Sequence, residues 1–174
     1  GGPGASFGIW YEEFNQILEI AKKYDLKITR MHTHIGSGSD PSVWQEVALK
    51  SIKYVQGFID GGHDVRTLNL GGGYKVGRMA GEKDTDLQEC GEPIRQAFLE
   101  FKRKNGIGLR LEIEPGTFLV AHAGSIISTI NDIVGTSLYK FIKADTGMTE
   151  NTRKALDGNR HPKRRAARRQ RPRP

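Results

Sequence analysis

The segment Val65–Tyr74, with the sequence VRTLNLGGGY, passes from an apolar strand pattern directly into three consecutive glycines. An apolar run that is closed by glycines predicts a strand whose carboxyl end opens into a loop. Backbone N–H groups without side chains beside them can approach a phosphate closely. Taken alone, the motif fits a tight turn at the rim of a barrel equally well.

Helix and strand patterns alternate on both sides of this segment. Asp40 followed by Pro41 predicts a capping side chain and a first-turn proline at the start of a helix. Pro93 is expected in the first turn of a later helix, which Asn105 and Gly106 end. Helical spacing of apolar residues covers residues 9–24, 39–62 and 94–104, and strand patterns cover residues 26–36, 65–70 and 108–116.

This alternation predicts an α/β fold with a parallel sheet, because connections of this length are too long for hairpins. Both a (β/α) barrel and an open doubly wound sheet satisfy the order. After Gly116 the sequence becomes rich in β-branched residues without an intervening helix, which indicates an antiparallel β region. We therefore expect the α/β part over residues 1–120, the start of a β domain over 121–158 and a basic, disordered tail over 159–174.

Polar or glycine-rich stretches, HIGSG, LGGGY and EPGT, follow the three predicted strands. Ligands of parallel α/β folds bind at the carboxyl ends of strands, so these stretches should converge on one site. His34 could stack on a planar ligand and Ser37 could contact a phosphate, while a protonated heteroaromatic nitrogen would hold Glu114 ionised. A structural histidine and an internal salt bridge are the alternatives. A glycine loop for phosphate, an imidazole and a carboxylate are together typical of a pocket for pyridoxal phosphate.

Other cofactors are disfavoured by the same residues. The glycines are contiguous and no helix follows at once, so the dinucleotide fingerprint is not matched, and the lysine and hydroxyl residue of an NTPase loop are missing. His32 and His34 would face the same side of one strand, but no third ligand follows at a suitable spacing, so no metal is expected. Cys90 is the single cysteine, which excludes an internal disulfide, and it is expected to be an ordinary helix residue.

The net charge of +7 is concentrated at the end of the chain. Eight of the 27 Lys and Arg residues lie from Arg160 to Pro174, which leaves 19 of them against 20 acidic residues in positions 1–159. Such a tail would bind nucleic acid only nonspecifically. No apolar run reaches the length of about 18 residues that a membrane span requires, and no secretory leader opens the chain, so a cytoplasmic protein is expected.

Four ordered motifs, HTHIGSG, LNLGGGY, EIEPGTFLVAHAG and KADTGMTENTR, resemble the fold-type III pyridoxal-phosphate-dependent decarboxylases over about residues 1–162. The resemblance implies a partial alanine-racemase-like (β/α)8 TIM barrel that leads into an antiparallel β domain. It also implies a homodimer with pyridoxal 5′-phosphate as cofactor. The last motif matches the branch that decarboxylates meso-2,6-diaminopimelate to L-lysine and CO2. Decarboxylases of ornithine, arginine or carboxynorspermidine are the nearest alternatives.

The resemblance also implies roles for individual residues. Glu114 would pair with the pyridine nitrogen, His34 would stack on the cofactor ring, and Arg153 would bind a substrate carboxylate through its planar guanidinium. The remaining cofactor contacts are expected from Ser37, Gly71, Gly72, Gly73, Gly116 and Thr117.

Departures from the family pattern weaken the expected site. Thr117 stands where many members carry arginine, Lys154 where they carry proline, and Asp157 where a tyrosine helps to hold the substrate. An acidic residue beside a carboxylate pocket would repel the substrate. The family's Schiff-base lysine and Cys-Glu-Ser motif have no counterpart in this sequence, so the chain alone is expected to be an inactive fragment without a catalytic residue. The alternative from another class is a non-enzymatic remnant whose tail binds polyanions.

Overall fold

The computed structural model describes residues 8–36, 38, 40–78 and 81–150 of the 174-residue chain. They form two compact units. The first contains the described residues up to Gly77 with Lys83–Ala121, and the second contains those from His122 onward with Arg78, Gly81 and Glu82. The first unit has a parallel sheet and the second an antiparallel one. The predicted α/β fold with a parallel sheet, followed by antiparallel strands, is confirmed.

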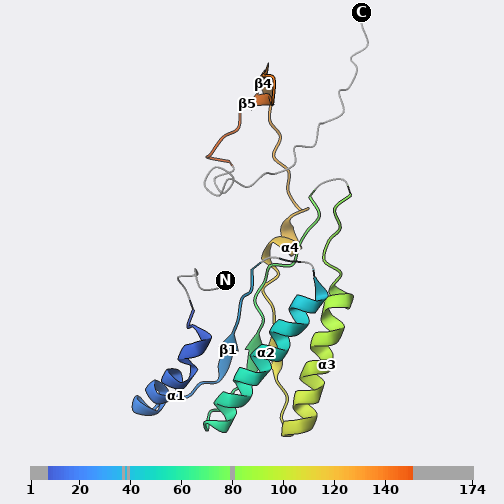
Figure 1. Cartoon of the computed structure of the whole chain (residues 1–174). Helices are drawn as coiled ribbons and strands as arrows, with labels where there is room; N and C mark the ends of the chain where they lie inside the picture. The colour runs from blue at the N-terminus through green and yellow to red at the C-terminus, as the bar shows by residue number, and fades with distance from the viewer. Residues whose placement is uncertain (1–7, 37, 39, 79–80, 151–174) are drawn as a thin grey trace, which may run out of the picture. The chain divides into compact units, whose positions relative to one another are not determined.

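Three short strands form the sheet of the first unit, in the order β1 (Arg30–His32), β2 (Thr67–Asn69) and β3 (Arg110–Glu112). Helices α2 (Pro41–Asp60) and α3 (Leu87–Asn105) connect the strands and lie side by side on one face of the sheet (Figure 1). A strand that runs parallel to its neighbour requires such a crossover. The loops that follow the strands therefore all leave from the same end of the sheet.

Side chains alternate between the two faces of this sheet. Leu68 in the middle of β2 is fully buried, and Met31 of β1 packs against the same core. The next row across the strands, His32, Asn69 and Glu112, points to the face opposite the helices. The helix face is therefore apolar, and the opposite face carries polar and charged groups.

The core of the first unit is densely apolar. Trp44 and Val55 of α2, and Leu70 at the end of β2, are 0% exposed. The Trp44 ring stacks on Tyr74, with ring centroids 4.5 Å apart and an interplanar angle of 10°. The other buried members of the core are Ala48, Phe58, Val65, Leu68, Cys90, Ile94 and Phe101. Because Tyr74 follows the three glycines, the core extends to the loop at the end of β2.

The two earlier helices begin as the sequence predicts. A 3-10 turn, η1 (Tyr11–Glu13), leads into α1 (Phe14–Lys23), which confirms the helix expected over residues 9–24. At the start of α2, the Asp40 carboxylate accepts a hydrogen bond from Ser42 N–H at 2.9 Å, which satisfies one of the free donors of the first turn.

Helix α3 begins at Leu87 rather than near Ile94, so the prediction that Pro93 lies in its first turn is wrong. Cys90 lies one turn before Ile94 on the same buried face. Burial of Cys90 in these additional turns and a cap from Asp86 offset the hydrogen bond that Pro93 cannot donate.

Asp86→Ala should lower the free energy of unfolding by about 1 kcal/mol, because the N-cap is lost. The Asp86 carboxylate accepts hydrogen bonds from Gln88 N–H at 2.9 Å and Glu89 N–H at 3.0 Å. Asp86→Asn keeps an oxygen acceptor and should retain most of the stability. Urea unfolding followed by circular dichroism measures both, and equal losses in the two variants would rule out capping as the role of Asp86.

A short helix, α4 (Gly116–Val120), follows β3 where the sequence pattern predicts β structure without a helix. That part of the prediction is wrong. Phe118 packs against the core and meets the Tyr74 ring edge-on, with centroids 6.3 Å apart. This tertiary contact prevails over the strand preference of the neighbouring β-branched residues.

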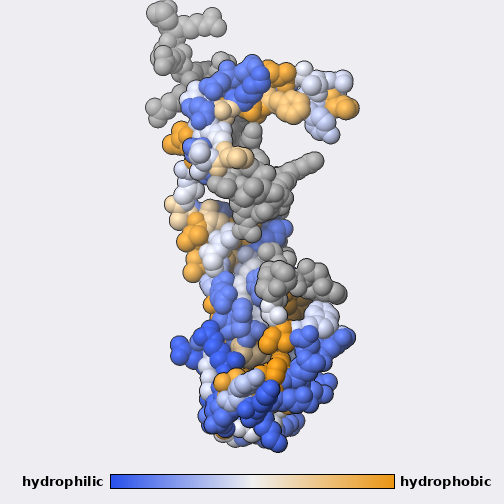
Figure 2. Space-filling view, turned by 90° about the vertical axis from the view of Figure 1, so that its left-hand side faces the viewer, coloured by the Kyte–Doolittle hydropathy of each residue, from blue (hydrophilic) through white to orange (hydrophobic). Residues whose placement is uncertain are grey.

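The second unit is a hairpin of β4 (Ile130–Gly135) and β5 (Lys140–Ala144). Thr136 N–H donates to Tyr139 O at 2.8 Å to close the turn. Lys143 Nζ lies 2.9 Å from Asp132 Oδ2 across the strands. Apolar side chains of the hairpin reach the surface, as the upper part of Figure 2 shows. In the described part of the chain, no helix has the length and apolar character needed to cross a membrane.

Candidate functional site

The carboxyl ends of the three parallel strands meet because backbone pairing continues past the last residue of each strand. Thr33 N–H donates to Asn69 O at 2.9 Å, and Glu114 N–H donates to Gly71 O at 2.8 Å. The ends of β1 and β3 are thus both tied to the end of β2. The structure brings His34, the three glycines and Glu114 into one region.

The glycines stand where larger residues do not fit. A Cβ on Gly72 would lie 2.0 Å from Glu114 O, and a Cβ on Gly71 would lie 2.7 Å from His34 Nδ1. Gly71 and Gly73 have φ angles of 73° and 100°, which other residues adopt only with strain. Glycine is therefore required for the loop after β2 to pass directly against the ends of β1 and β3.

Two N–H groups of this loop are already engaged within the chain. Gly71 N–H donates to Asn69 Oδ1 at 2.7 Å, and Gly72 N–H donates to His34 Nδ1 at 3.3 Å. Gly73 N–H has no partner among the described residues. An anion at this loop would therefore find Gly73 N–H free, while the first two glycines hold the shape of the loop.

His34 is oriented by the same contact. Because Nδ1 accepts from Gly72 N–H, the neutral imidazole carries its proton on Nε2. The side chain is exposed at the end of β1, so it is open to a planar ligand.

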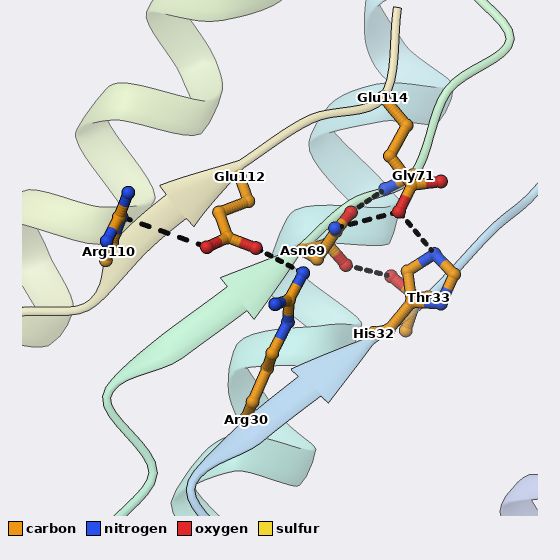
Figure 3. A network of polar contacts seen from close by, with 8 residues as sticks. All are labelled: Arg30, His32, Thr33, Asn69, Gly71, Arg110, Glu112 and Glu114. Atoms are coloured by element: carbon orange, nitrogen blue, oxygen red, sulfur yellow. Dashed lines mark hydrogen bonds and ion pairs between the residues drawn. The ribbon is translucent and has the colours of Figure 1, made fainter.

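One carboxylate oxygen of Glu114 contacts side chains from both β1 and β2 (Figure 3). Asn69 Nδ2–H donates to Glu114 Oε1 at 2.9 Å, and His32 Nε2 lies 3.6 Å from the same oxygen. Asn69 is only 3% exposed, whereas the side chains of His32 and Glu114 are 50% and 54% exposed. The buried Asn69 amide thus holds the Glu114 carboxylate on one side, and the other side of the carboxylate faces solvent.

Glu112 occupies the same face of β3 and has guanidinium partners. Arg30 forms an ion pair with it from β1, and Arg110 Nε lies 3.8 Å from its Oε1 (Figure 3). Among the described residues, no lysine or arginine pairs with Glu114. Of these two acidic residues at the carboxyl end of β3, Glu114 is therefore the one whose charge is available to a cationic ligand.

The remaining predicted contacts are only partly placed. Gly116 begins α4 with a φ of 26°, and Thr117 is exposed in the first turn of that helix. Ser37 and Arg153, two of the predicted contacts, lie outside the described residues. So do Lys154 and Asp157, which depart from the family pattern.

Cys90 belongs to the core of α3. It is 1% exposed, and burial raises the pKa of its thiol. Burial likewise raises the pKa of the Tyr74 phenol. A thiol that is both covered and held protonated is a poor nucleophile, so Cys90 contributes packing.

Asn69 is the residue of this site that the sequence patterns did not single out. Its signal was a polar residue between Leu68 and Leu70, directly before the glycines. A buried amide requires both a donor partner and an acceptor partner, which here are the loop and Glu114.

The fold and the strand-end site are those of a cofactor-binding domain in which a glycine loop, an imidazole and a carboxylate converge. The family model for "Pyridoxal-dependent decarboxylase, pyridoxal binding domain" matches residues 1–121, and the chain belongs to this family.

Within the family, the chain is similar to diaminopimelate decarboxylases. It is 30% identical to that of Escherichia coli over 161 residues and 32% identical to that of Streptomyces coelicolor, covering 92% of this chain in both cases. A crystal structure of the Helicobacter pylori diaminopimelate decarboxylase complexed with L-lysine superimposes with a TM-score of 0.74 at 27% identity over 92% of this chain. The chain spans 38%, 36% and 39% of these three proteins, respectively.

Pyridoxal 5′-phosphate is the cofactor of this family, and the residues of the site fit it. At Gly71 and Gly72 the loop presents backbone where a Cβ would collide, and Gly73 N–H, which has no partner among the described residues, can bind a phosphate. Glu114 has no guanidinium partner among the described residues, so it can face a protonated ring nitrogen. His34 is exposed beside both.

Proposed function

We propose that the chain supplies the cofactor-binding part of a decarboxylase that converts meso-2,6-diaminopimelate to L-lysine and CO2. The observation that carries this proposal is the convergence of His34, the Gly71–Gly73 loop and Glu114 at the ends of three parallel strands. The choice of substrate rests on the diaminopimelate decarboxylases among its relatives and on the TGMTENTR stretch.

Each group acts on a different part of the cofactor. When bound, pyridoxal 5′-phosphate supplies an electron sink for the charge that remains on the substrate carbon as CO2 leaves. Glu114 holds the proton on the ring nitrogen by its negative charge, and His34 stacks on the ring. The Gly73 N–H group binds the phosphate, with Ser37, Gly116 and Thr117 as further contacts.

The wider assembly is part of the same proposal. The three strands form part of an alanine-racemase-like (β/α)8 barrel, and the hairpin of the second unit starts the β domain. Within the described residues, the outer edges of β1 and β3 have no strand partner. In a complete barrel, further strands would pair with both of these edges. Arg153 binds a substrate carboxylate, and the whole enzyme works as a cytoplasmic homodimer. The basic tail adds only nonspecific affinity for nucleic acid.

Titration with pyridoxal 5′-phosphate tests the cofactor site. We expect saturable binding, read by absorbance, with borohydride reduction to separate this binding from attachment to surface lysines. His34→Ala should weaken binding about 2- to 12-fold, because an aromatic stacking contact contributes ~0.5–1.5 kcal/mol. His63→Ala is the matched control, since His63 lies before β2, at the other end of the sheet. Equal effects of both variants would contradict the stacking role.

Substrate choice requires a separate measurement. When an enzyme that contains this sequence and spans the full length of its relatives is assayed, it should release CO2 from meso-2,6-diaminopimelate and not from ornithine or arginine. Preference for ornithine or arginine would assign the chain to another branch of the family.

A nucleic-acid binding experiment tests the non-enzymatic alternative. If the chain binds no pyridoxal 5′-phosphate but binds nucleic acid, and loses this binding when residues 160–174 are removed, the non-enzymatic hypothesis would replace the proposal.

A further inference from the structure

We infer that Asn69 is a positioning residue, which sets the orientation of the Glu114 carboxylate toward the cofactor ring and couples it to the glycine loop. The inference rests on the proposed function of the site. It concerns a residue whose side-chain amide is engaged by Glu114 and Gly71, so that it would act on the cofactor only through these neighbours.

The two ends of the Asn69 amide bind different parts of the site. Nδ2–H donates to Glu114 Oε1 at 2.9 Å, just past the end of β3, and Oδ1 accepts from Gly71 N–H at 2.7 Å in the loop after β2 (Figure 3). These two contacts also fix which end of the amide is nitrogen. In the reverse orientation, the amide N–H would face the Gly71 N–H donor and the amide oxygen would face the Glu114 carboxylate.

The contact with Glu114 determines which of its oxygens is free. Asn69 and His32 both address Oε1, and Oε2 has no partner among the described residues. A carboxylate on a side chain that is 54% exposed would otherwise rotate among several positions. Held by Asn69, Glu114 offers Oε2 in a fixed direction, which lowers the entropy lost when a ligand binds.

Burial makes Asn69 suited to this role. The residue is 3% exposed, and its backbone O accepts from Thr33 N–H at 2.9 Å, so β1 also constrains it. His32 is a weaker support, because its side chain is half exposed and its Nε2 lies 3.6 Å from Oε1. A hydrogen bond from a buried amide to a carboxylate is among the stronger contacts in proteins.

A double-mutant cycle on ligand binding separates this role from a purely structural one. The probe is 4′-deoxypyridoxine 5′-phosphate, which has the ring nitrogen and the phosphate but no aldehyde to react with lysines. Asn69→Leu should raise its Kd on the order of tenfold in the unmodified chain, the size expected for one charge-assisted hydrogen bond. In a chain that already carries Glu114→Ala, the same change should raise Kd less than about twofold. Asn69→Asp keeps an acceptor for Gly71 N–H and serves as a second variant if Asn69→Leu does not fold.

Asn105→Leu is the matched control, because Asn105 is partly buried and, like Asn69, donates a hydrogen bond from Nδ2, here to Phe101 O at 3.0 Å at the end of α3. It should leave Kd unchanged in both backgrounds, and thermal unfolding confirms that each variant is folded. An equal rise in Kd with and without Glu114 would show that Asn69 acts on the loop alone and would overturn the inference. Absence of saturable binding by the unmodified chain would instead overturn the proposed function.

Discussion

A chain that carries Gly72→Ala is expected to lose most of its affinity for pyridoxal 5′-phosphate and to unfold more readily than the unmodified chain. The added Cβ would lie 2.0 Å from Glu114 O and 3.0 Å from Glu114 C, and both atoms are backbone that cannot rotate away. Either the loop or the end of β3 must shift. Overpacking of this kind lowers the free energy of unfolding by about 1–3 kcal/mol, and the backbone collision places Gly72 at the upper end.

Loss of affinity should follow from the same shift, because Glu114 and the loop lie on the two sides of the collision. We expect Kd to rise on the order of tenfold or more, as for the loss of one charge-assisted contact. Gly91→Ala is the control: a Cβ there meets nothing within 4 Å, and Gly91 lies inside α3. That change should raise stability by about 0.5–1 kcal/mol and leave Kd unchanged. Chemical unfolding and ligand titration of both variants are the measurements, and an unaffected Gly72→Ala variant would show that the loop is not held against β3.

Trp44→Ala should have the largest effect on stability. Trp44 is 0% exposed and stacks on Tyr74, so its removal leaves a cavity in the centre of the core. Substitutions of this kind lower the free energy of unfolding by about 3–5 kcal/mol, a large part of the 5–15 kcal/mol typical of a folded domain. Because Tyr74 follows the glycine loop directly, cofactor binding should weaken as well.

Val43→Ala provides the comparison for Trp44→Ala. Val43 precedes Trp44 on α2 but is 41% exposed, so its truncation should change stability by less than about 0.5 kcal/mol. Trp44→Phe keeps a ring beside Tyr74 and should fall between the two. Urea unfolding monitored by circular dichroism measures all three, and similar losses for Val43→Ala and Trp44→Ala would contradict the assignment of Trp44 to the core.

The convergence at the strand ends could be anticipated because it depends on topology. In a parallel sheet the carboxyl ends share one edge, so motifs that follow successive strands meet there whatever the details of the loops. His34 and Glu114 were identified on that basis, and the structure places both beside the glycine loop. The parallel sheet itself follows from the alternation of helix and strand patterns.

Features that depend on tertiary contacts were missed. The early start of α3 depends on the burial of Cys90 against helix and sheet, which local propensity around Pro93 does not reveal. The short α4 depends on Phe118 reaching Tyr74. Asn69 was overlooked because the role of a polar residue in an apolar strand is evident only once its hydrogen-bond partners, here Glu114 and Gly71, are known.

The parallel pairing of β1, β2 and β3 also bears on how the chain folds. Each strand partner lies about 40 residues away in the sequence, with a whole helix between them. Helices can form within microseconds, but strand contacts across such loops must first overcome the entropy of loop closure. We therefore expect slow refolding, during which unpaired strand edges of different molecules compete with the native pairing. Yield on refolding should accordingly fall as the protein concentration rises.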